Sequence, residues 1–259
     1  RTEHVINAIK LIYASTFFKG PKSFSRRVGH RTEEEKMAVI IQSMVGDTYG
    51  EHFYPALSGV AQSHNYYPFS HMKPEEGIAT IALGLGKMVV EGEKTLRFSP
   101  RYPQLLPQRS TVEDILANSQ RYFYALKLEK TCSMLSINDT SHLDKREISD
   151  AENEYPVSFL SSIYIPNEHR IRDTSHGPGH RVITFSQILK YNSFPLPDII
   201  STFLNIGQNG MGCPVEIEFS VNLSQKRGIP PTFALLQLRP MTARAELEVI
   251  DISDEEIEN

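Results

Sequence analysis

Two short runs near the C-terminus carry the side chains best suited to chemistry: Val215-Glu216-Ile217-Glu218-Phe219 and Leu235-Leu236-Gln237-Leu238-Arg239. Apolar and polar residues alternate in both runs, which is typical of strands that bury one face. The stretch between them is rich in turn-forming residues, so the pattern predicts an antiparallel hairpin of residues 214–222 and 232–239. In such a hairpin Glu216, Glu218, Gln237 and Arg239 lie on one face.

These four side chains could hold a divalent cation against a polyphosphate. Carboxylate oxygens are the ligands that Mg²⁺ prefers, and the planar guanidinium of Arg239 matches the geometry of phosphate oxygens. The same pattern also fits a solvated sheet face that carries a Glu–Arg cross-strand pair. The alternation alone leaves both interpretations open.

The composition describes a soluble globular chain of one large or two ordinary domains, with 259 residues, 40% of them hydrophobic and 22% charged. A net charge of −4 and a pI near 6.2 argue against nucleic acid as a partner. The two cysteines, Cys132 and Cys213, form no CxxC motif, which argues against a disulfide scaffold or a zinc site and suits a reducing compartment.

No secretory signal pattern is present, and the apolar run at 77–90 is interrupted by Lys87 and too short to cross a bilayer. A cytoplasmic protein without membrane contact is therefore expected. Because the chain starts at Arg1 inside a helical pattern, we expect it to be a piece of something longer. The sequence leaves the oligomeric state open, a homo-oligomer included.

Helices and strands are both predicted, without strict alternation, which indicates an α+β class. The Thr111/Asp114 pair has the form of a capping box, and a helix is expected from Pro197 to near Gly207. Residues 129–180 are interpreted as a surface excursion and 246–259 as an acidic tail or linker. The other expected elements are a helix with one buried stripe at 3–15, a buried strand at 36–45, and strands near 57–63, 77–83, 122–128, 157–165 and 181–185.

Six segments, in the same order and at similar spacing over about residues 8–241, resemble one family: AIKLIYASTFFKGPKSFSRR, IIQSMVG, LSGVAQS, GLGKMVVEGEKTLRFSP, VEIEF and LLQLRP. The family is the nucleotide-binding domain of phosphoenolpyruvate synthase and pyruvate phosphate dikinase. The resemblance implies an ATP-grasp-like fold, with residues 1–245 as the larger C-terminal part of the domain. It also implies ATP and Mg²⁺ as cofactors.

The resemblance assigns roles to individual residues. Glu218 binds Mg²⁺ with the nucleotide, and Glu216 is its partner acid in the predicted metal site. Arg239 contacts the ATP phosphates, so Glu218 and Arg239 are the predicted catalytic residues. The remaining predicted nucleotide-binding residues are Gln42 in a strand that lines the cleft, Gln237, and the small residues Ser58 and Gly59, which let the backbone approach the ligand.

The implied activity is that of a kinase or phosphotransferase within a longer chain. Phosphoryl passes from Mg–ATP to a histidine on a separate domain and on to pyruvate on a third, and the isolated fragment is expected to be inactive. The chain departs from the family pattern at Pro21, where the synthases carry arginine, and in the residues after Val60. The alternative is therefore a non-catalytic nucleotide-sensing or regulatory module of the same fold.

Three other motifs invite a functional interpretation. Gly84-Leu85-Gly86 could cradle a phosphate, but a structural turn is favoured because the complete phosphate-loop patterns are absent. Thr174-Ser175-His176 resembles the start of the family's phosphohistidine motif, but it lacks the alanines that follow and precedes the VEIEF strand, so it is rejected as the phosphoryl carrier. The aromatic residues Tyr66, Tyr67 and Phe69 could stack on adenine or form core.

Overall fold

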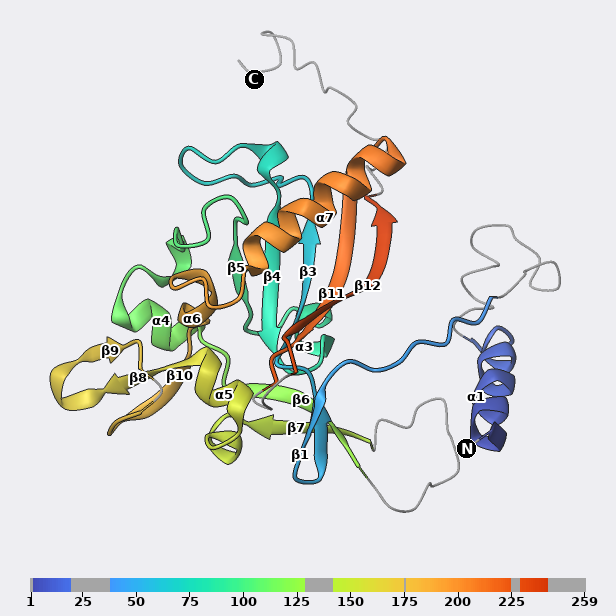
Figure 1. Cartoon of the computed structure of the whole chain (residues 1–259), viewed down its shortest axis with the longest axis horizontal. Helices are drawn as coiled ribbons and strands as arrows, with labels where there is room; N and C mark the ends of the chain where they lie inside the picture. The colour runs from blue at the N-terminus through green and yellow to red at the C-terminus, as the bar shows by residue number, and fades with distance from the viewer. Residues whose placement is uncertain (1, 20–37, 129–141, 175, 225–228, 242–259) are drawn as a thin grey trace, which may run out of the picture.

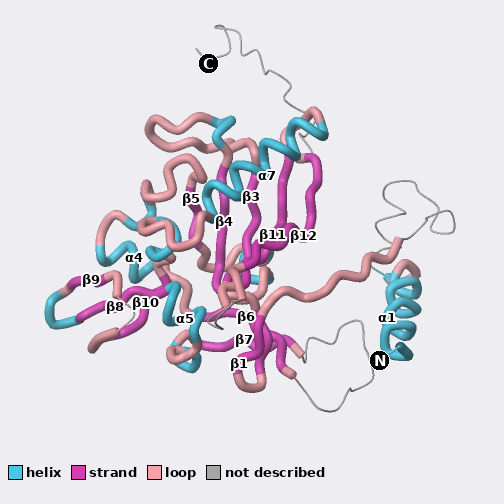
Figure 2. Tube along the Cα trace, viewed as in Figure 1, coloured by secondary structure: helices cyan, strands magenta, loops and turns pink. Residues whose placement is uncertain are grey.

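The computed structural model describes residues 2–19, 38–128, 142–174, 176–224 and 229–241. Its described residues form a mixed α/β structure with three antiparallel sheets (Figures 1 and 2). The α+β class predicted from the sequence agrees with this architecture. The main helices are α1 (Thr2–Ser15), α3 (Lys87–Val90), α4 (Val112–Asn118), α5 (Tyr155–Leu160), α6 (Ser186–Leu189) and α7 (Leu196–Met211).

The largest sheet has five strands in the order β12-β11-β3-β4-β5. The strands are β3 (Leu57–Gln62), β4 (Ile78–Leu83), β5 (Leu96–Phe98), β11 (Val215–Asn222) and β12 (Thr232–Pro240). Strands from the first and last thirds of the described chain therefore lie side by side, with β11 between β12 and β3 (Figure 1). This order places residues of β3, β4 and β5 on the same surface as the C-terminal hairpin.

The predicted hairpin is confirmed. β11 and β12 pair antiparallel, with Glu216 opposite Arg239 and Glu218 opposite Gln237. The structure adds an irregularity that the alternation does not predict: the register shifts after Glu218, so that Phe219 lies opposite Leu235 and Leu236 is the extra residue of a β-bulge. Beyond the bulge Phe233 lies opposite Val221 and its ring stacks on that of Phe219, so apolar contacts continue on the same face of the hairpin.

That apolar face is covered by α7 (Figure 1). The helix starts with a proline in its first turn, as predicted, but it continues past Gly207 to Met211. Gly212 follows as the C-cap in the left-handed conformation. Gly207 lies inside the helix and lets it approach the hairpin closely: a Cβ there would lie 2.8 Å from Leu238 and 3.2 Å from Val215. The close approach seals the core on this side of the sheet.

The two smaller sheets extend the core. One has the order β1-β2-β6-β7 and the other β10-β8-β9. Their strands are β1 (Asp47–Tyr49), β2 (His52–Tyr54), β6 (Tyr122–Lys127), β7 (Leu143–Glu147), β8 (Ser161–Ile165), β9 (Arg170–Arg172) and β10 (His180–Ile183).

The predicted capping box at the start of α4 is confirmed, since Thr111 Oγ1 accepts from the N–H of Asp114 and Asp114 Oδ2 accepts from the N–H of Thr111.

The N-terminal part differs from the prediction. The helix at 3–15 forms as α1, but none of its residues is buried, and it stands apart from the sheets in Figure 1. The predicted strand at 36–45 is wrong for its described part, because residues 38–46 form no strand and Ile40 and Ile41 are 81% and 71% exposed. An apolar run becomes a buried strand only where a neighbouring strand and a covering layer exist.

The predicted surface excursion at 129–180 is also wrong for much of its length. β7 pairs with β6, and α5 buries Val157 and Leu160 completely. Residues 157–160 are helical rather than part of a strand, and the strand begins only at Ser161. The part of this segment that includes Val157, Leu160 and Ile163 therefore contributes to the core.

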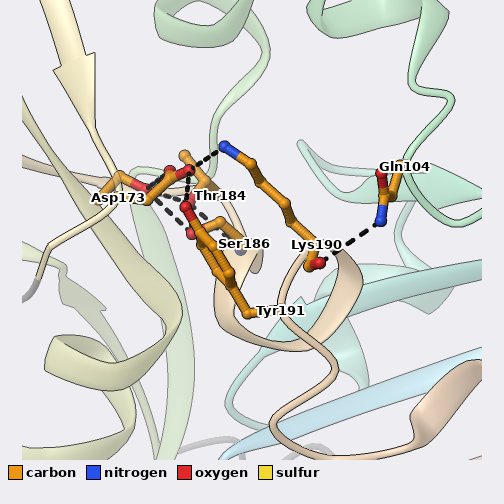
Figure 3. A network of polar contacts seen from close by, with 7 residues as sticks. Gln104, Asp173, Thr184, Ser186, Lys190 and Tyr191 are labelled. Carbon is orange, nitrogen blue, oxygen red and sulfur yellow. Dashed lines mark hydrogen bonds and ion pairs between the residues drawn. The ribbon is translucent and has the colours of Figure 1, made fainter.

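A polar network ties the β8–β9–β10 sheet to α6 (Figure 3). Asp173 accepts hydrogen bonds from Lys190 Nζ at 2.7 Å, Ser162 Oγ at 2.9 Å and Tyr191 Oη at 3.2 Å. Burial acts to raise the pKa of Asp173, but the hydrogen bonds from Lys190 and Ser162 outweigh it and hold the pKa below its ordinary value. The network therefore favours the charged carboxylate.

Asp173→Asn is expected to lower the free energy of unfolding by about 1–3 kcal/mol, because it removes charge-assisted hydrogen bonds. Since the folded pKa of Asp173 lies below its unfolded pKa, the wild-type advantage is present above the unfolded pKa, near 4, and disappears as the pH falls through the folded pKa. Urea unfolding of both proteins from pH 7 to pH 2.5 measures it. A gap between the two proteins that stays constant down to pH 2.5 would contradict the assigned charge state.

Candidate functional site

A polar pocket lies on the face of the five-stranded sheet opposite α7. Its volume is about 510 Å³, and α3 contributes Val89 and Val90 to its wall. The polar side chains that line it come from the five strands of the sheet: Gln62, Thr80, Arg97, Glu216, Glu218 and Arg239. The hairpin residues identified from the sequence thus share the pocket with residues from β3, β4 and β5.

Glu216 holds Arg239 in place. Arg239 Nε donates to Glu216 Oε1 at 2.8 Å and its Nη2 donates to the same oxygen, while Gln62 Nε2 donates to Glu216 Oε2 at 2.6 Å. The hydrogen bond and the charge of Glu216 raise the pKa of Arg239, which stays cationic. Both oxygens of Glu216 are therefore engaged by neighbouring side chains.

Glu218 is arranged differently. Its nearest charged neighbour is Arg239, with Nη2 at 3.9 Å from Glu218 Oε1, beyond hydrogen-bonding distance. Its side chain is 33% exposed, compared with 12% for Glu216. Of the two acids, Glu218 has the carboxylate that can accept a new ligand without losing a hydrogen bond to the protein.

The donor set fits Mg²⁺ held together with a phosphate. The described residues contain no cluster of three or more His, Cys, Asp or Glu side chains that could hold a metal ion alone. Mg²⁺ usually keeps several waters and takes one or two carboxylates plus substrate phosphates, so a single open acid beside guanidinium groups is sufficient. Glu218 would be the protein ligand in that arrangement.

Gln42 and Gln237 lie at the hairpin but not in the pocket wall. Gln42 Nε2 donates to the backbone O of Leu236 at 2.9 Å, so this side chain binds the extra residue of the bulge. Gln237 is exposed and lies opposite Glu218. The predicted strand around Gln42 is absent, and its side chain contacts the backbone of the hairpin instead of lining the pocket as predicted.

Ser58 and Gly59 do not line the pocket. Ser58 is buried beside the Gly84-Leu85-Gly86 turn, and its hydroxyl contacts Gly84 O at 2.8 Å and Ser220 Oγ at 2.9 Å. Gly59 provides space for a ring, because a Cβ there would lie 2.5 Å from Phe219 Cζ and 2.7 Å from Thr80 O. The structure thus gives these two residues packing contacts where ligand contacts were predicted.

Gly59→Ala is expected to destabilise the protein by about 1–3 kcal/mol, because the methyl group overpacks the Phe219 ring and the β4 backbone. Gly210→Ala is the matched control: it lies in α7, where a methyl group would have no neighbouring atom within 4 Å and alanine gains helix propensity. Thermal unfolding of both variants measures the difference. A Gly59→Ala protein as stable as wild type would contradict the packing role.

The sequence patterns did not identify Gln62 and Arg97 as site residues. Both alternate with apolar neighbours in their strands, but they reach the pocket only through the order of the sheet, which pairs Gln62 with Glu216 and Arg97 with Thr80. This order is a long-range property, so no local signal in the sequence could have found them.

Two further predictions concern described residues outside the polar pocket. The aromatic residues Tyr66, Tyr67 and Phe69 are all exposed, so their interpretation as core is wrong. His176 is exposed and does not line the pocket. Pro21 lies outside the described residues.

The pocket of this α+β domain contains two carboxylates and two guanidinium groups. Such a set of side chains can bind an anionic ligand together with a metal ion. The chain matches the family model of the pyruvate phosphate dikinase AMP/ATP-binding domain over residues 1–259. It therefore belongs to that family, and the suspected resemblance is confirmed. A comparison with curated proteins gave no match.

In the part of the chain that the structure describes, no helix is both long and apolar enough to cross a membrane.

Proposed function

We propose that the pocket binds Mg–ATP, and that the chain is the ATP-binding part of a phosphoenolpyruvate synthase-like phosphotransferase with an ATP-grasp-like fold. In the proposed reaction, phosphoryl passes from ATP to a histidine on a separate domain and on to pyruvate. The single observation that supports it most is the convergence of Glu216, Glu218 and Arg239 on one pocket. Membership of an AMP/ATP-binding family supports the nucleotide.

Each side chain has a distinct role in this proposal. Glu218 coordinates Mg²⁺, which would neutralise the phosphate oxygens. Arg239 contacts the transferred phosphoryl group through its guanidinium, and Glu216 with Gln62 fixes the direction of that guanidinium. Because catalysis of phosphoryl transfer is mostly positioning and charge stabilisation, a stiff hairpin is a suitable support for these groups. Residues 1–245 would form the partial nucleotide domain, and 246–259 a tail or linker.

A non-catalytic nucleotide sensor is the second candidate. It is favoured by Pro21 at the position where the synthases carry arginine. It is also favoured by the ion pair of Arg239 with Glu216, because the carboxylate neutralises part of the positive charge that would otherwise attract phosphate. A sensor would bind the nucleotide and leave it intact.

Incubation of the full-length protein with Mg²⁺ and ATP carrying labelled β- and γ-phosphates separates the two candidates. The phosphotransferase predicts acid-labile, base-stable label on the protein, as expected for phosphohistidine, and its transfer to pyruvate. Saturable ATP binding without any covalent label would favour the sensor. Absence of both binding and label would refute both candidates.

A further inference from the structure

A second, more apolar pocket adjoins the polar one. Its volume is about 240 Å³, and it shares Ile78 and Arg97 with the polar pocket. Tyr67 and Phe69, exposed on the loop after β3, form part of its wall together with Met72 and Phe98. The two pockets therefore form neighbouring compartments that meet at the Arg97 side chain.

Ser99 supplies an unusual polar atom in this wall. The residue is only 1% exposed, and its Oγ has no hydrogen-bond partner among the described residues. Buried hydroxyl groups are nearly always hydrogen-bonded, because leaving one unpaired costs its full desolvation free energy. Ser99 is one of the residues that line the pocket, so its buried hydroxyl can recover this free energy once rotation about the Cα–Cβ bond presents it to a ligand atom.

Arg97 supplies the charge. It lies on β5 opposite Thr80, is exposed, and forms no ion pair with any residue in the described ranges, in contrast to Arg239. A guanidinium binds carboxylate or phosphate through two parallel hydrogen bonds. Asn65 adds a buried amide whose Oδ1 accepts from the N–H of Tyr67. The compartment thus combines an apolar body with one cation and one unpaired hydroxyl.

We propose that this compartment is a binding site for a compact organic anion with a planar body. Its acidic group pairs with Arg97 and its planar body lies against Tyr67, Phe69 and Met72. The Ser99 side chain rotates toward the ligand, and a ligand acceptor atom takes the hydrogen bond of its hydroxyl. The volume suits a single ring or a short acid rather than a whole nucleotide. This site adjoins the proposed Mg–ATP pocket and shares Arg97 with it, but the proposal does not require that a nucleotide binds.

The probes are pyridine-2-, 3- and 4-carboxylate, which combine a planar ring, an acceptor nitrogen and a carboxylate. The neutral pyridylmethanols are matched controls without the charge. The full-length protein, without nucleotide and with methyl-labelled methionines, is titrated while the Met72 resonance is followed. At least one carboxylate is expected to bind with Kd on the order of 1 mM or tighter, and at least tenfold more tightly than its neutral analogue.

Three variants test the assigned contacts. Arg97→Met should weaken the best probe at least tenfold. Ser99→Ala should weaken it by a similar factor and yet raise Tm of the ligand-free protein by about 2–4 °C, because it removes an unpaired buried hydroxyl. Ser63→Ala is the control of opposite sign: the Ser63 hydroxyl accepts from the N–H of Val215 at 2.9 Å, so its loss should lower Tm and leave probe binding unchanged.

Several results would overturn the proposal. They are the absence of any Met72 shift at probe concentrations about tenfold above the expected Kd, equal binding of neutral and anionic probes, and unchanged probe affinity in Ser99→Ala. Displacement of the probe by adenosine, which lacks phosphate, would show that the compartment receives the nucleobase and would also refute a separate site. Failure of ATP binding with intact probe binding would refute only the proposed nucleotide function.

Discussion

Glu218→Gln in the full-length protein is expected to reduce ATP-dependent phosphoryl transfer about 100-fold or more, with Tm nearly unchanged. The amide has the shape of the carboxylate and replaces a side chain that forms no hydrogen bond within the described residues, so the fold loses little. The amide oxygen is neutral, however, and cannot compensate the charge of Mg²⁺. A metal ion contributes several kcal/mol to stabilising transition-state charge, and about 2.7 kcal/mol corresponds to 100-fold.

Initial rates of label transfer at saturating ATP, over a range of Mg²⁺ concentrations, measure this effect. Part of the lost rate should return at high Mg²⁺ if the variant only weakens metal binding. Glu75→Gln is the matched control, since Glu75 is exposed and lies outside the pocket. Wild-type transfer by Glu218→Gln, with a normal melt, would show that the acid of the site has been assigned wrongly.

Arg239→Lys is expected to lower phosphoryl transfer about tenfold to 100-fold. A lysine keeps the charge but cannot form the two-pronged contact of a guanidinium with phosphate oxygens. Charge-assisted hydrogen bonds contribute about 1.5–3 kcal/mol each, which corresponds to the expected range. The effect on stability should be small, because Arg239 is 54% exposed and exposed ion pairs contribute little. The same label-transfer rates, together with thermal melts, measure both effects.

Glu216→Gln tests whether Glu216 acts through Arg239. The substitution removes the charge that fixes the guanidinium, so it should reduce transfer by nearly the same factor as Arg239→Lys. The double variant should be little worse than either single variant, since both changes disrupt one unit. Fully multiplicative losses would instead indicate that Glu216 contacts the metal or the phosphate independently.

The local part of the site could be predicted from the sequence because alternation is a local property. Glu216 and Glu218 are two residues apart, and so are Gln237 and Arg239, so each pair must share a face. The turn-rich stretch between the runs then determines their pairing. The bulge at Leu236 could not be predicted in this way. The extra residue changes the strand pairing only from Phe219 onward and leaves the alternation around Glu216 and Glu218 unchanged.

The remaining pocket residues depend on the order of the sheet. Gln62 and Arg97 meet Glu216 and Thr80 only because β3 lies between β11 and β4 and β5 pairs with β4, and no local pattern specifies that order. Local sequence patterns also gave wrong predictions at positions where tertiary packing determines the structure. The apolar residues 38–45 were predicted as part of a buried strand, although no strand pairs with them in the described structure. Gly59 was assigned to a ligand, although its missing side chain makes room for Phe219.

A crystal structure of the full-length protein with Mg²⁺ and a non-hydrolysable ATP analogue tests the central claim most directly. We expect Mg²⁺ at about 2.0–2.1 Å from a carboxylate oxygen of Glu218 and from phosphate oxygens. We also expect phosphate oxygens within hydrogen-bonding distance of the Arg239 guanidinium, with the Glu216–Arg239 contact retained. A bound nucleotide whose metal and phosphates contact neither Glu218 nor Arg239 would contradict the proposed site.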